Sequence, residues 1–272
     1  MLFLHLTDIH LVHPDLDDPN VHTDTIANLG KMVEIIQAMD PAPDFVVLSG
    51  DLTNQGDVAS YELLRDTLAP LAMPLLFTLG NHDDRRAFHQ VFPEVCPDSP
   101  PDAPLCHVSR IGALQVVTLD SLIPGQTSGG LDARQFDFLQ ETLASNPDQP
   151  TLLVVHHPPF MAGQAAYRWE SMTPQDSEKL AGILASHNIV GMLCGHVHHN
   201  KVVQWHGIPV IVNNGLHNLI DVTVSDALAI KDCTGFGLCK YHDYGLSVTF
   251  LPLTPDQPIT KSLPKAIVEK FR

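Results

Sequence analysis

The sequence lacks any long apolar segment. None of its hydrophobic runs approaches the ~20 residues that a membrane-spanning helix needs, although hydrophobic residues make up 44% of the chain. A chain of 272 residues with this composition can bury a sizeable core, so we expect a globular protein. The N-terminus shows no basic stretch followed by an apolar segment and a small-residue cleavage site. We therefore expect a cytoplasmic protein with no membrane partner.

Basic residues are also scarce. Lys and Arg together number 15, against 31 Asp and Glu, which gives a formal net charge of −16. Such a surface repels nucleic acid, and no basic stripe with interleaved aromatic residues offsets this charge. We therefore expect no nucleic-acid partner, and a small molecule as the substrate.

The chain has no C-x-x-C pair, which argues against a zinc–thiolate site. Its five cysteines are Cys96, Cys106, Cys194, Cys233 and Cys239. We favour free thiols in a reducing compartment. Cys96 with Cys106, and Cys233 with Cys239, are close enough in sequence to form disulfides under oxidising conditions, and spacing alone leaves this alternative open.

Apolar runs alternate with helix-like segments along the chain. The runs predict strands at residues 2–7, 45–49, 75–79, 114–119, 151–155, 189–194, 210–213 and 246–251. Apolar residues at helical spacing predict helices at 23–39, 58–68, 133–143 and 175–187, the last with Thr173 and Pro174 as its cap and first turn. Because several strands are continuously apolar, both of their faces should be covered. The alternation predicts a layered α/β fold.

No internal repeat or long linker divides the chain, so we expect a single domain over residues 1–272. The proline-rich segment 93–104 and the glycine-containing segment 125–130 should be surface loops. Residues 221–235 show no clear period, and we interpret them as an insertion or a lid.

Histidine is abundant, with 16 residues, and many of these histidines stand with carboxylate or amide residues directly after the predicted strands. The residues in these positions are Asp8, His10, Asp51, Asn81, His82, His156, His157, His196 and His198. Residues two apart on an extended chain point to the same side. Asp8 and His10 can therefore bind one ion together, and His196 and His198 lie on one side of their segment. The two oxygens of Asp51 can bridge two ions.

The candidate ligands comprise two carboxylates, one amide and four imidazoles, without thiolate. This donor set suits Mn, Fe, Co or Zn. Two such ions ~3.5–4 Å apart are a known device for hydrolysing phosphate esters. We therefore expect two divalent metal ions as cofactors.

Five blocks occur in order between residues 8 and 198: D-x-H, G-D-x-x-N, G-N-H-D, H-H-P-P and G-H-x-H. Together they resemble the calcineurin-like metallophosphoesterase superfamily. The resemblance implies an αββα fold, in which a β-sandwich is flanked by helices in four layers. The chain is most similar to the bacterial cyclic-nucleotide phosphodiesterase and glycerophosphodiesterase subgroup, because the third block continues as G-N-H-D-D-R with Arg85 and because the domain is compact.

The resemblance also implies a role for each matching residue. The first ion would be bound by Asp8, His10 and His198, the second by Asn81, His156 and His196, with Asp51 as the bridge. His82 would contact the substrate phosphate, so Asp51 and His82 are the expected catalytic residues. The implied reaction is hydrolysis of a small phosphodiester, either a 3′,5′-cyclic nucleotide or a glycerophosphodiester, by metal-bound hydroxide.

Several residues and functions stay open on the sequence. His217 follows the strand after the last block and could line the substrate pocket. His157 could orient its loop, and Asp120 with Ser121 could orient a ligand imidazole. In some relatives the C-terminal region forms a cap or a dimer interface. Residues 216–240 could take that role here, giving a possible homodimer or higher homo-oligomer. The alternative functions are phosphomonoesterase, nucleotide pyrophosphatase, nuclease and non-catalytic scaffold.

Overall fold

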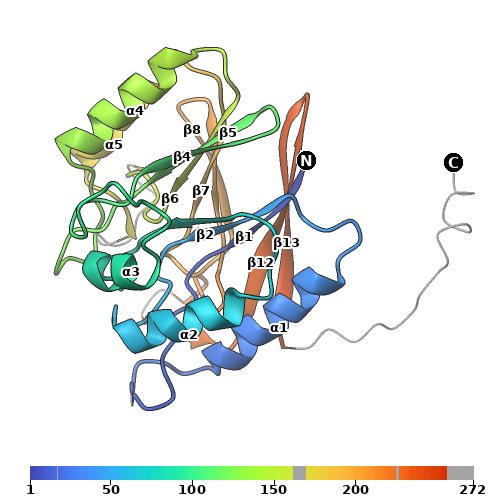
Figure 1. Ribbon diagram of the computed structural model, residues 1–272. Helices are drawn as coiled ribbons and strands as arrows, with labels where there is room; N and C mark the ends of the chain where they lie inside the picture. Colours follow the sequence, from blue (N-terminus) through green and yellow to red (C-terminus); the bar gives the residue numbers. More distant parts are fainter. Residues whose placement is uncertain (17, 162–169, 225–226, 256–272) are drawn as a thin grey trace, which may run out of the picture.

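A computed structural model describes residues 1–16, 18–161, 170–224 and 227–255, and shows two β-sheets packed face to face (Figure 1). The first sheet has the order β13-β12-β1-β2-β3 and the second the order β4-β5-β6-β7-β9-β8. The first contains β1 (Leu2–Leu6), β2 (Phe45–Ser49), β3 (Leu75–Thr78), β12 (Thr234–His242) and β13 (Gly245–Thr254). The second contains β4 (His107–Ile111), β5 (Leu114–Leu119), β6 (Thr151–Val155), β7 (Ile189–Cys194), β8 (Lys201–Trp205) and β9 (Ile208–Val212).

The central strands of both sheets run parallel. In the first sheet β1 pairs with β2 and β2 with β3; in the second, β5, β6, β7 and β9 form the parallel part. Antiparallel strands add to the edges: β12 and β13 on the first sheet, β4 and β8 on the second. The carboxyl ends of parallel strands meet at one edge of a sheet, which is where open α/β sheets bind their ligands.

Helices cover the outer face of each sheet (Figure 1). The helices α1 (Thr25–Ala38), α2 (Val58–Leu68) and α3 (Arg85–Val91) pack on the first sheet. The helices α4 (Ala133–Ser145) and α5 (Pro174–Leu184) pack on the second. The four-layer αββα arrangement implied by the resemblance is thus confirmed.

Side chains of the buried strands point alternately to the two faces of each sheet and so form three apolar layers. In β1, Leu4 and Leu6 face the helices, while Phe3 lies between the sheets. Phe3 stacks on Phe45 of β2, with ring centroids 4.5 Å apart. Because both faces of the central strands are covered, these strands are apolar at nearly every position.

Each helix starts at a side-chain cap. Asp24, Asp57, Asp84 and Asp132 each accept a hydrogen bond from a backbone N–H in the first turn of α1 to α4. Thr173 caps α5 and Pro174 opens its first turn, as predicted. The predicted helices are confirmed, and α3 is an additional helix of 7 residues.

The segment 216–240, considered as a cap or dimer insertion, divides into two parts. Its first part contains the short hairpin β10 (Leu219–Ile220) and β11 (Ile230–Lys231), where Val222, Leu228 and Ile230 are exposed. Residues 234–240 instead lie in β12, which pairs with β1 inside the first sheet. This second part is therefore a strand of the first sheet.

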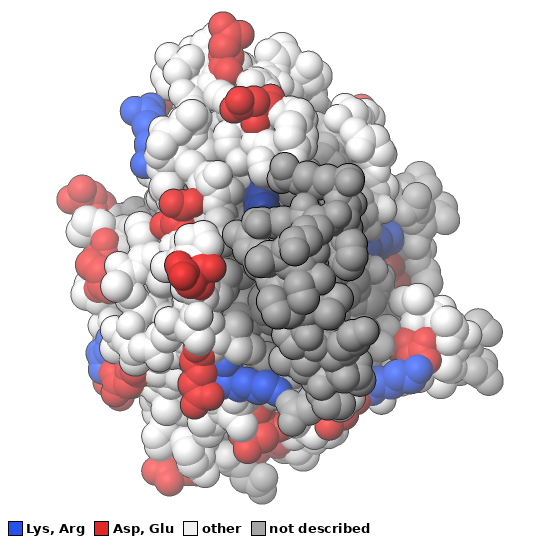
Figure 2. Space-filling view, turned by 90° about the vertical axis from the view of Figure 1, so that its right-hand side faces the viewer, with Lys and Arg blue, Asp and Glu red and all other residues white. Residues whose placement is uncertain are grey.

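The surface and the cysteines agree with the sequence. On the face shown in Figure 2, acidic side chains are spread widely, and the described basic side chains lie at scattered positions rather than in one band. All five cysteines are free, and Cys194 and Cys239 are buried. No helix in the described part of the chain has the length and apolar character needed to cross a membrane.

The fold predicts that Leu6→Ala destabilises the protein. Leu6 is a fully buried residue of β1 that packs against the helices. Its truncation should therefore lower the free energy of unfolding by about 2–5 kcal/mol in urea denaturation. The matched control is Leu228→Ala, because Leu228 is 53% exposed; it should change stability by less than about 0.5 kcal/mol. Equal effects of the two variants would contradict the layer assignment.

Candidate metal centre

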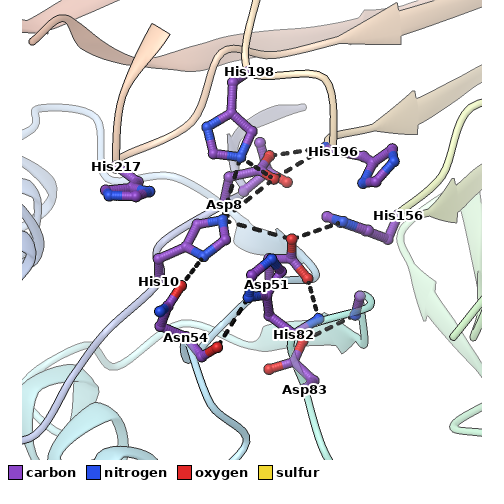
Figure 3. Close-up of polar contacts among 12 residues, drawn as sticks. Asp8, His10, Asp51, Asn54, His82, Asp83, His156, His196, His198 and His217 are labelled. Atoms are coloured by element: carbon purple, nitrogen blue, oxygen red, sulfur yellow. Dashed lines mark hydrogen bonds and ion pairs between the residues drawn. The ribbon is translucent and has the colours of Figure 1, made fainter. Parts of the chain in front are cut away.

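The candidate ligands converge where loops from both sheets meet (Figure 3). Each candidate lies just beyond the carboxyl end of a parallel strand. Asp8 and His10 follow β1, Asp51 follows β2, Asn81 and His82 follow β3, His156 follows β6, and His196 and His198 follow β7. The two sheets are joined here by direct bonds: the His196 N–H donates to both oxygens of Asp8 at 3.0 Å. The site therefore forms only when the sandwich is assembled.

The backbone at these residues is strained. Asp8, His10, Asp51, His196 and His198 all have positive φ, between 47° and 76°. A left-handed conformation costs a non-glycine residue roughly 1–2 kcal/mol. Among the described residues, the one other non-glycine residue with positive φ is His206, in the turn between β8 and β9. Strain concentrated in this way is typical of functional sites.

Two glycines allow the backbones to approach the carboxylates. A Cβ on Gly80 would collide with the Asp51 carboxylate and with the His156 ring. A Cβ on Gly195 would collide with Thr7 and Asp8. Glycine is therefore required before Asn81 and before His196 in the sequence blocks, because a larger residue would collide with the neighbouring side chains.

Four side chains form the first group. His10 Nε2 lies 3.2 Å from His198 Nε2 and 3.5 Å from Asp51 Oδ2. His198 Nε2 lies 3.3 Å from Asp8 Oδ1. One ligand atom from each of Asp8, His10, Asp51 and His198 lies within 4.8 Å of all the others. This group can hold a metal ion, and it contains the three residues expected around the first ion together with Asp51.

The second group lies on the other side of Asp51. His156 Nε2 is 3.2 Å from Asp51 Oδ2, and one ring nitrogen of His196 lies within 4.8 Å of those of His156 and His157. Asn81 Oδ1 is buried without a hydrogen-bond partner among the described residues. Buried polar atoms are nearly always paired, so this unpaired oxygen fits a place for a cation. Asp51 lies between the two groups, as a bridging carboxylate would.

His157 lies close to this group, but its two ring nitrogens bond to other residues. Its Nδ1 is bonded to Ser121 Oγ at 2.7 Å and its Nε2 to the Thr127 carbonyl at 3.0 Å. Both ring nitrogens are therefore used, which matches the expected role of His157 in orienting its loop. Ser121 is its partner, whereas Asp120 accepts from Arg85 Nε at 2.7 Å.

Three candidate ligand imidazoles are held in the same way. Their Nδ1 atoms lie 2.7–2.8 Å from oxygens that only accept: His10 from Asn54 Oδ1, His198 from Asn218 Oδ1, and His156 from the Ser49 carbonyl. Nδ1 must therefore carry a hydrogen, which directs Nε2 into the centre. Asn218 is a residue that the sequence motifs did not reveal. Asn54 is the last letter of the G-D-x-x-N block, although no role was expected for it from the sequence.

His82 and His217 flank the first group. The His82 N–H donates to Asp51 Oδ1 at 2.9 Å, and its Nδ1 donates to the Asn54 carbonyl at 2.9 Å. The rings of His82 and His217 pack 4.6 Å and 4.7 Å from that of His10. Asn218 Nδ2 donates to His217 Nδ1 at 3.0 Å. The structure thus brings both predicted substrate-contacting histidines to the centre.

The electrostatics of the centre couple carboxylates to imidazoles. Burial opposes charge on Asp8, but the neighbouring His198 and His156 together outweigh it and hold the pKa of Asp8 below its usual range. Burial lowers the pKa of His156, and the adjacent Asp51 carboxylate outweighs burial and raises that pKa to about 9. The two buried carboxylates therefore favour positive charge beside them.

Asp83 is a further residue whose role the sequence did not reveal. Its buried carboxylate accepts from the N–H groups of Leu52, Thr53 and Gly80 and from the Tyr61 hydroxyl, at 2.8–3.2 Å. Burial, and then the Asp51 charge, raise the pKa of Asp83 to about 7. Asp83 ties the loop of Asp51 to the loop of Asn81.

Comparisons with known proteins agree with this geometry. The family model described as calcineurin-like phosphoesterase matches residues 1–200. A probable cyclic nucleotide phosphodiesterase of Rhodococcus erythropolis is 32% identical over 77% of this chain and 68% of its own. A cAMP/cGMP dual specificity phosphodiesterase of Mycobacterium tuberculosis is 30% identical over 82% of this chain and 70% of its own.

Two further comparisons concern a glycerophosphodiester phosphodiesterase and a solved structure. A probable glycerophosphodiester phosphodiesterase of Arcobacter nitrofigilis is 31% identical over 65% of this chain and 64% of its own. Among solved structures, a dimetal phosphatase from Danio rerio has a TM-score of 0.68 at 14% identity, covering 93% of this chain and 98% of its own. At that identity, the structural likeness concerns the fold.

The bonds of Asp83 predict that Asp83→Asn weakens the protein. An asparagine keeps the shape but has one accepting oxygen, so at least one buried N–H loses its partner. We expect the free energy of unfolding to fall by about 1–3 kcal/mol in urea denaturation. Asp137→Asn, at an exposed position on α4, is the control and should leave stability unchanged. If the Asp83→Asn protein were as stable as the control, these hydrogen bonds would not contribute to the stability of the protein.

Proposed function

Because the chain belongs to the calcineurin-like phosphoesterase family, we propose that it is a phosphodiesterase that uses two divalent metal ions to hydrolyse a small phosphodiester. One observation carries the proposal: imidazole and carboxylate side chains form two groups, around His10 and around His156, and both groups reach Asp51. The candidates from all five sequence blocks contribute to this arrangement, which favours a catalytic centre over a scaffold.

We assign the ligands by their groups. Asp8, His10 and His198 would hold the first ion, and Asn81, His156 and His196 would hold the second. Asp51 would be shared between them, since its Oδ2 lies 3.5 Å from His10 Nε2 and 3.2 Å from His156 Nε2. The fit rests on the inward Nε2 atoms, on the unpaired Asn81 Oδ1, and on the buried negative charge. Mixed nitrogen and oxygen donors without thiolate suit Mn, Fe, Zn or Co.

The bound ions would acidify a water molecule and neutralise the phosphoryl oxygens. The protein supplies the remaining contacts. His82 gives its Nδ1 hydrogen to the Asn54 carbonyl, which leaves Nε2 to meet a phosphoryl oxygen or the leaving group once that nitrogen is protonated. His82 is exposed at the mouth of the centre, so substrate can reach it. His217 also packs against the His10 ring, and we propose that it contacts the substrate as well.

The substrate that we propose is a 3′,5′-cyclic nucleotide or a glycerophosphodiester. Relatives at 30–32% identity are named for each. The net charge of −16 favours a small substrate over a nucleic acid. The five free thiols are typical of a reducing compartment, which supports a cytoplasmic location.

The reaction is tested by turnover of 3′,5′-cAMP and of glycerophosphoethanolamine, side by side, after metal-free protein is reconstituted with Mn²⁺. Bis(p-nitrophenyl) phosphate and p-nitrophenyl phosphate serve as reporters for diester and monoester chemistry. We expect kcat/KM for one natural diester, and for the diester reporter, to exceed that for the monoester. Preferred turnover of the monoester would identify a phosphomonoesterase and overturn the proposal.

Two substitutions separate metal binding from catalysis. Asp51→Ala removes the proposed bridge, so the variant should lose bound metal and activity together. His82→Ala should retain the metal content of the wild type and lose kcat by about 10²–10³-fold, the usual cost of removing one group that stabilises transition-state charge. Metal content is measured by mass spectrometry and kcat on the diester reporter. Full activity in Asp51→Ala would exclude the bridging role.

A further inference from the structure

The side chain of Asn54 contacts the proposed metal ligand His10 (Figure 3), and its other end meets the carboxylate of Asp18. Its Oδ1 is 2.7 Å from His10 Nδ1, and its Nδ2 is 2.5 Å from Asp18 Oδ2. The two ends of an asparagine amide have nearly the same shape, so either end fits either side. The hydrogen-bond chemistry of the two partners decides which end faces His10.

A reversed Asn54 amide would be damaging. Its NH₂ group would then donate to His10 Nδ1, which would have to give up its hydrogen. The neutral imidazole would carry that hydrogen on Nε2 instead. Since Nε2 faces Asp51 and His198 in the centre, His10 would lose the lone pair with which it binds a cation.

Asp18 excludes the reversed orientation. An ionised carboxylate accepts hydrogen bonds and donates none, so it tolerates only the NH₂ end of Asn54. The carboxylate is itself fixed: Oδ2 also accepts from Gln55 Nε2 at 2.7 Å, and Oδ1 accepts from the N–H and the side-chain amide of Asn20 at 3.0 and 3.2 Å. These bonds hold the Asp18 pKa at about 2, below its usual value, so the group is ionised at neutral pH.

We propose that Asp18, which touches no proposed metal ligand and lies outside the five sequence blocks, is a positioning residue that sets the tautomer of His10 through Asn54. The chain Asp18–Asn54–His10 fixes a hydrogen on Nδ1 and a lone pair on Nε2. The consequence for metal affinity rests on the proposed function, whereas the tautomer itself does not.

Among the described residues, Asn218, which orients His198, has no carboxylate partner of the kind that Asn54 has in Asp18. His198 therefore serves as an internal control. Asn218 Oδ1 holds His198 Nδ1 at 2.8 Å, but its NH₂ end meets the His217 ring rather than a carboxylate. An imidazole nitrogen can accept or donate. A change at position 18 should therefore alter the tautomer of His10 and leave that of His198 unchanged.

The test compares Asp18→Asn, Asn54→Asp and the double variant. In Asp18→Asn the new amide can either donate to Asn54 or accept from it. It therefore no longer excludes the reversed orientation of the Asn54 amide. Asn54→Asp alone places two carboxylates against each other. In the double variant the new carboxylate at position 54 accepts from His10 Nδ1 and from the new amide at position 18, so the chain is restored with its charge moved by one residue. The control is Asp15→Asn, because Asp15 lies in the same loop with its side chain 91% exposed.

The first readout is the ¹⁵N chemical shift of the imidazole nitrogens in the metal-free protein. Wild type, Asp15→Asn and the double variant should show hydrogen on His10 Nδ1, and Asp18→Asn should gain a population with hydrogen on Nε2. The second readout is Mn²⁺ affinity by calorimetry. It should weaken about 10–100-fold in Asp18→Asn, as for other partners that orient a ligand histidine, and recover in the double variant.

Two results would overturn the proposal. One is an unchanged His10 tautomer in Asp18→Asn. The other is a loss of affinity that the double variant does not recover, because Asp18 would then merely hold its loop. Thermal unfolding identifies any variant that fails to fold, and Asp18→Ala then supplies the tautomer readout. If the wild type binds no Mn²⁺, the proposed function fails, while the tautomer result still decides the role of Asp18.

Discussion

Two buried carboxylates at the junction of two sheets are the constraint on which the rest of the centre depends. Asp8 and Asp51 are almost fully enclosed, and their partners in the described structure are imidazoles and backbone N–H groups. Buried charge is costly unless it is paired. The strained backbone at five ligand positions and the space reserved by Gly80 and Gly195 all bring cation-binding atoms toward these carboxylates. A site built at such cost in local conformation is built to hold positive charge.

Neither sheet carries a complete set of ligands. The first sheet supplies Asp8, His10, Asp51 and Asn81, and the second supplies His156, His196 and His198. Bonds across the junction link the halves: His156 Nδ1 to the Ser49 carbonyl, and the His196 N–H to Asp8. The apolar layer between the sheets therefore fixes the distances on which metal binding depends. Amide and carbonyl oxygens orient the imidazoles of His10, His156 and His198, and Asn54 and Asn218 supply two of these oxygens.

The sequence predicted the central strands, four helices and every proposed ligand, because continuous apolar runs and polar strand ends are local signals. No apolar run marked the bounds of β12, the first strand of the terminal hairpin, since Gly235 and Gly237 weaken the strand pattern and pairing with β1 and β13 decides the conformation. The sequence missed α3 because 7 residues give no period. The roles of Asp83, Asn218 and Asp18 depend on contacts between loops distant in sequence, which spacing cannot show.

Two metal ions on either side of Asp51 would be seen by anomalous diffraction from a crystal of the protein grown with Mn²⁺. We expect two peaks ~3.5–4 Å apart, one beside Asp8, His10 and His198, the other beside Asn81, His156 and His196, with Asp51 contacting both. A single peak, or peaks away from these side chains, would contradict this expectation.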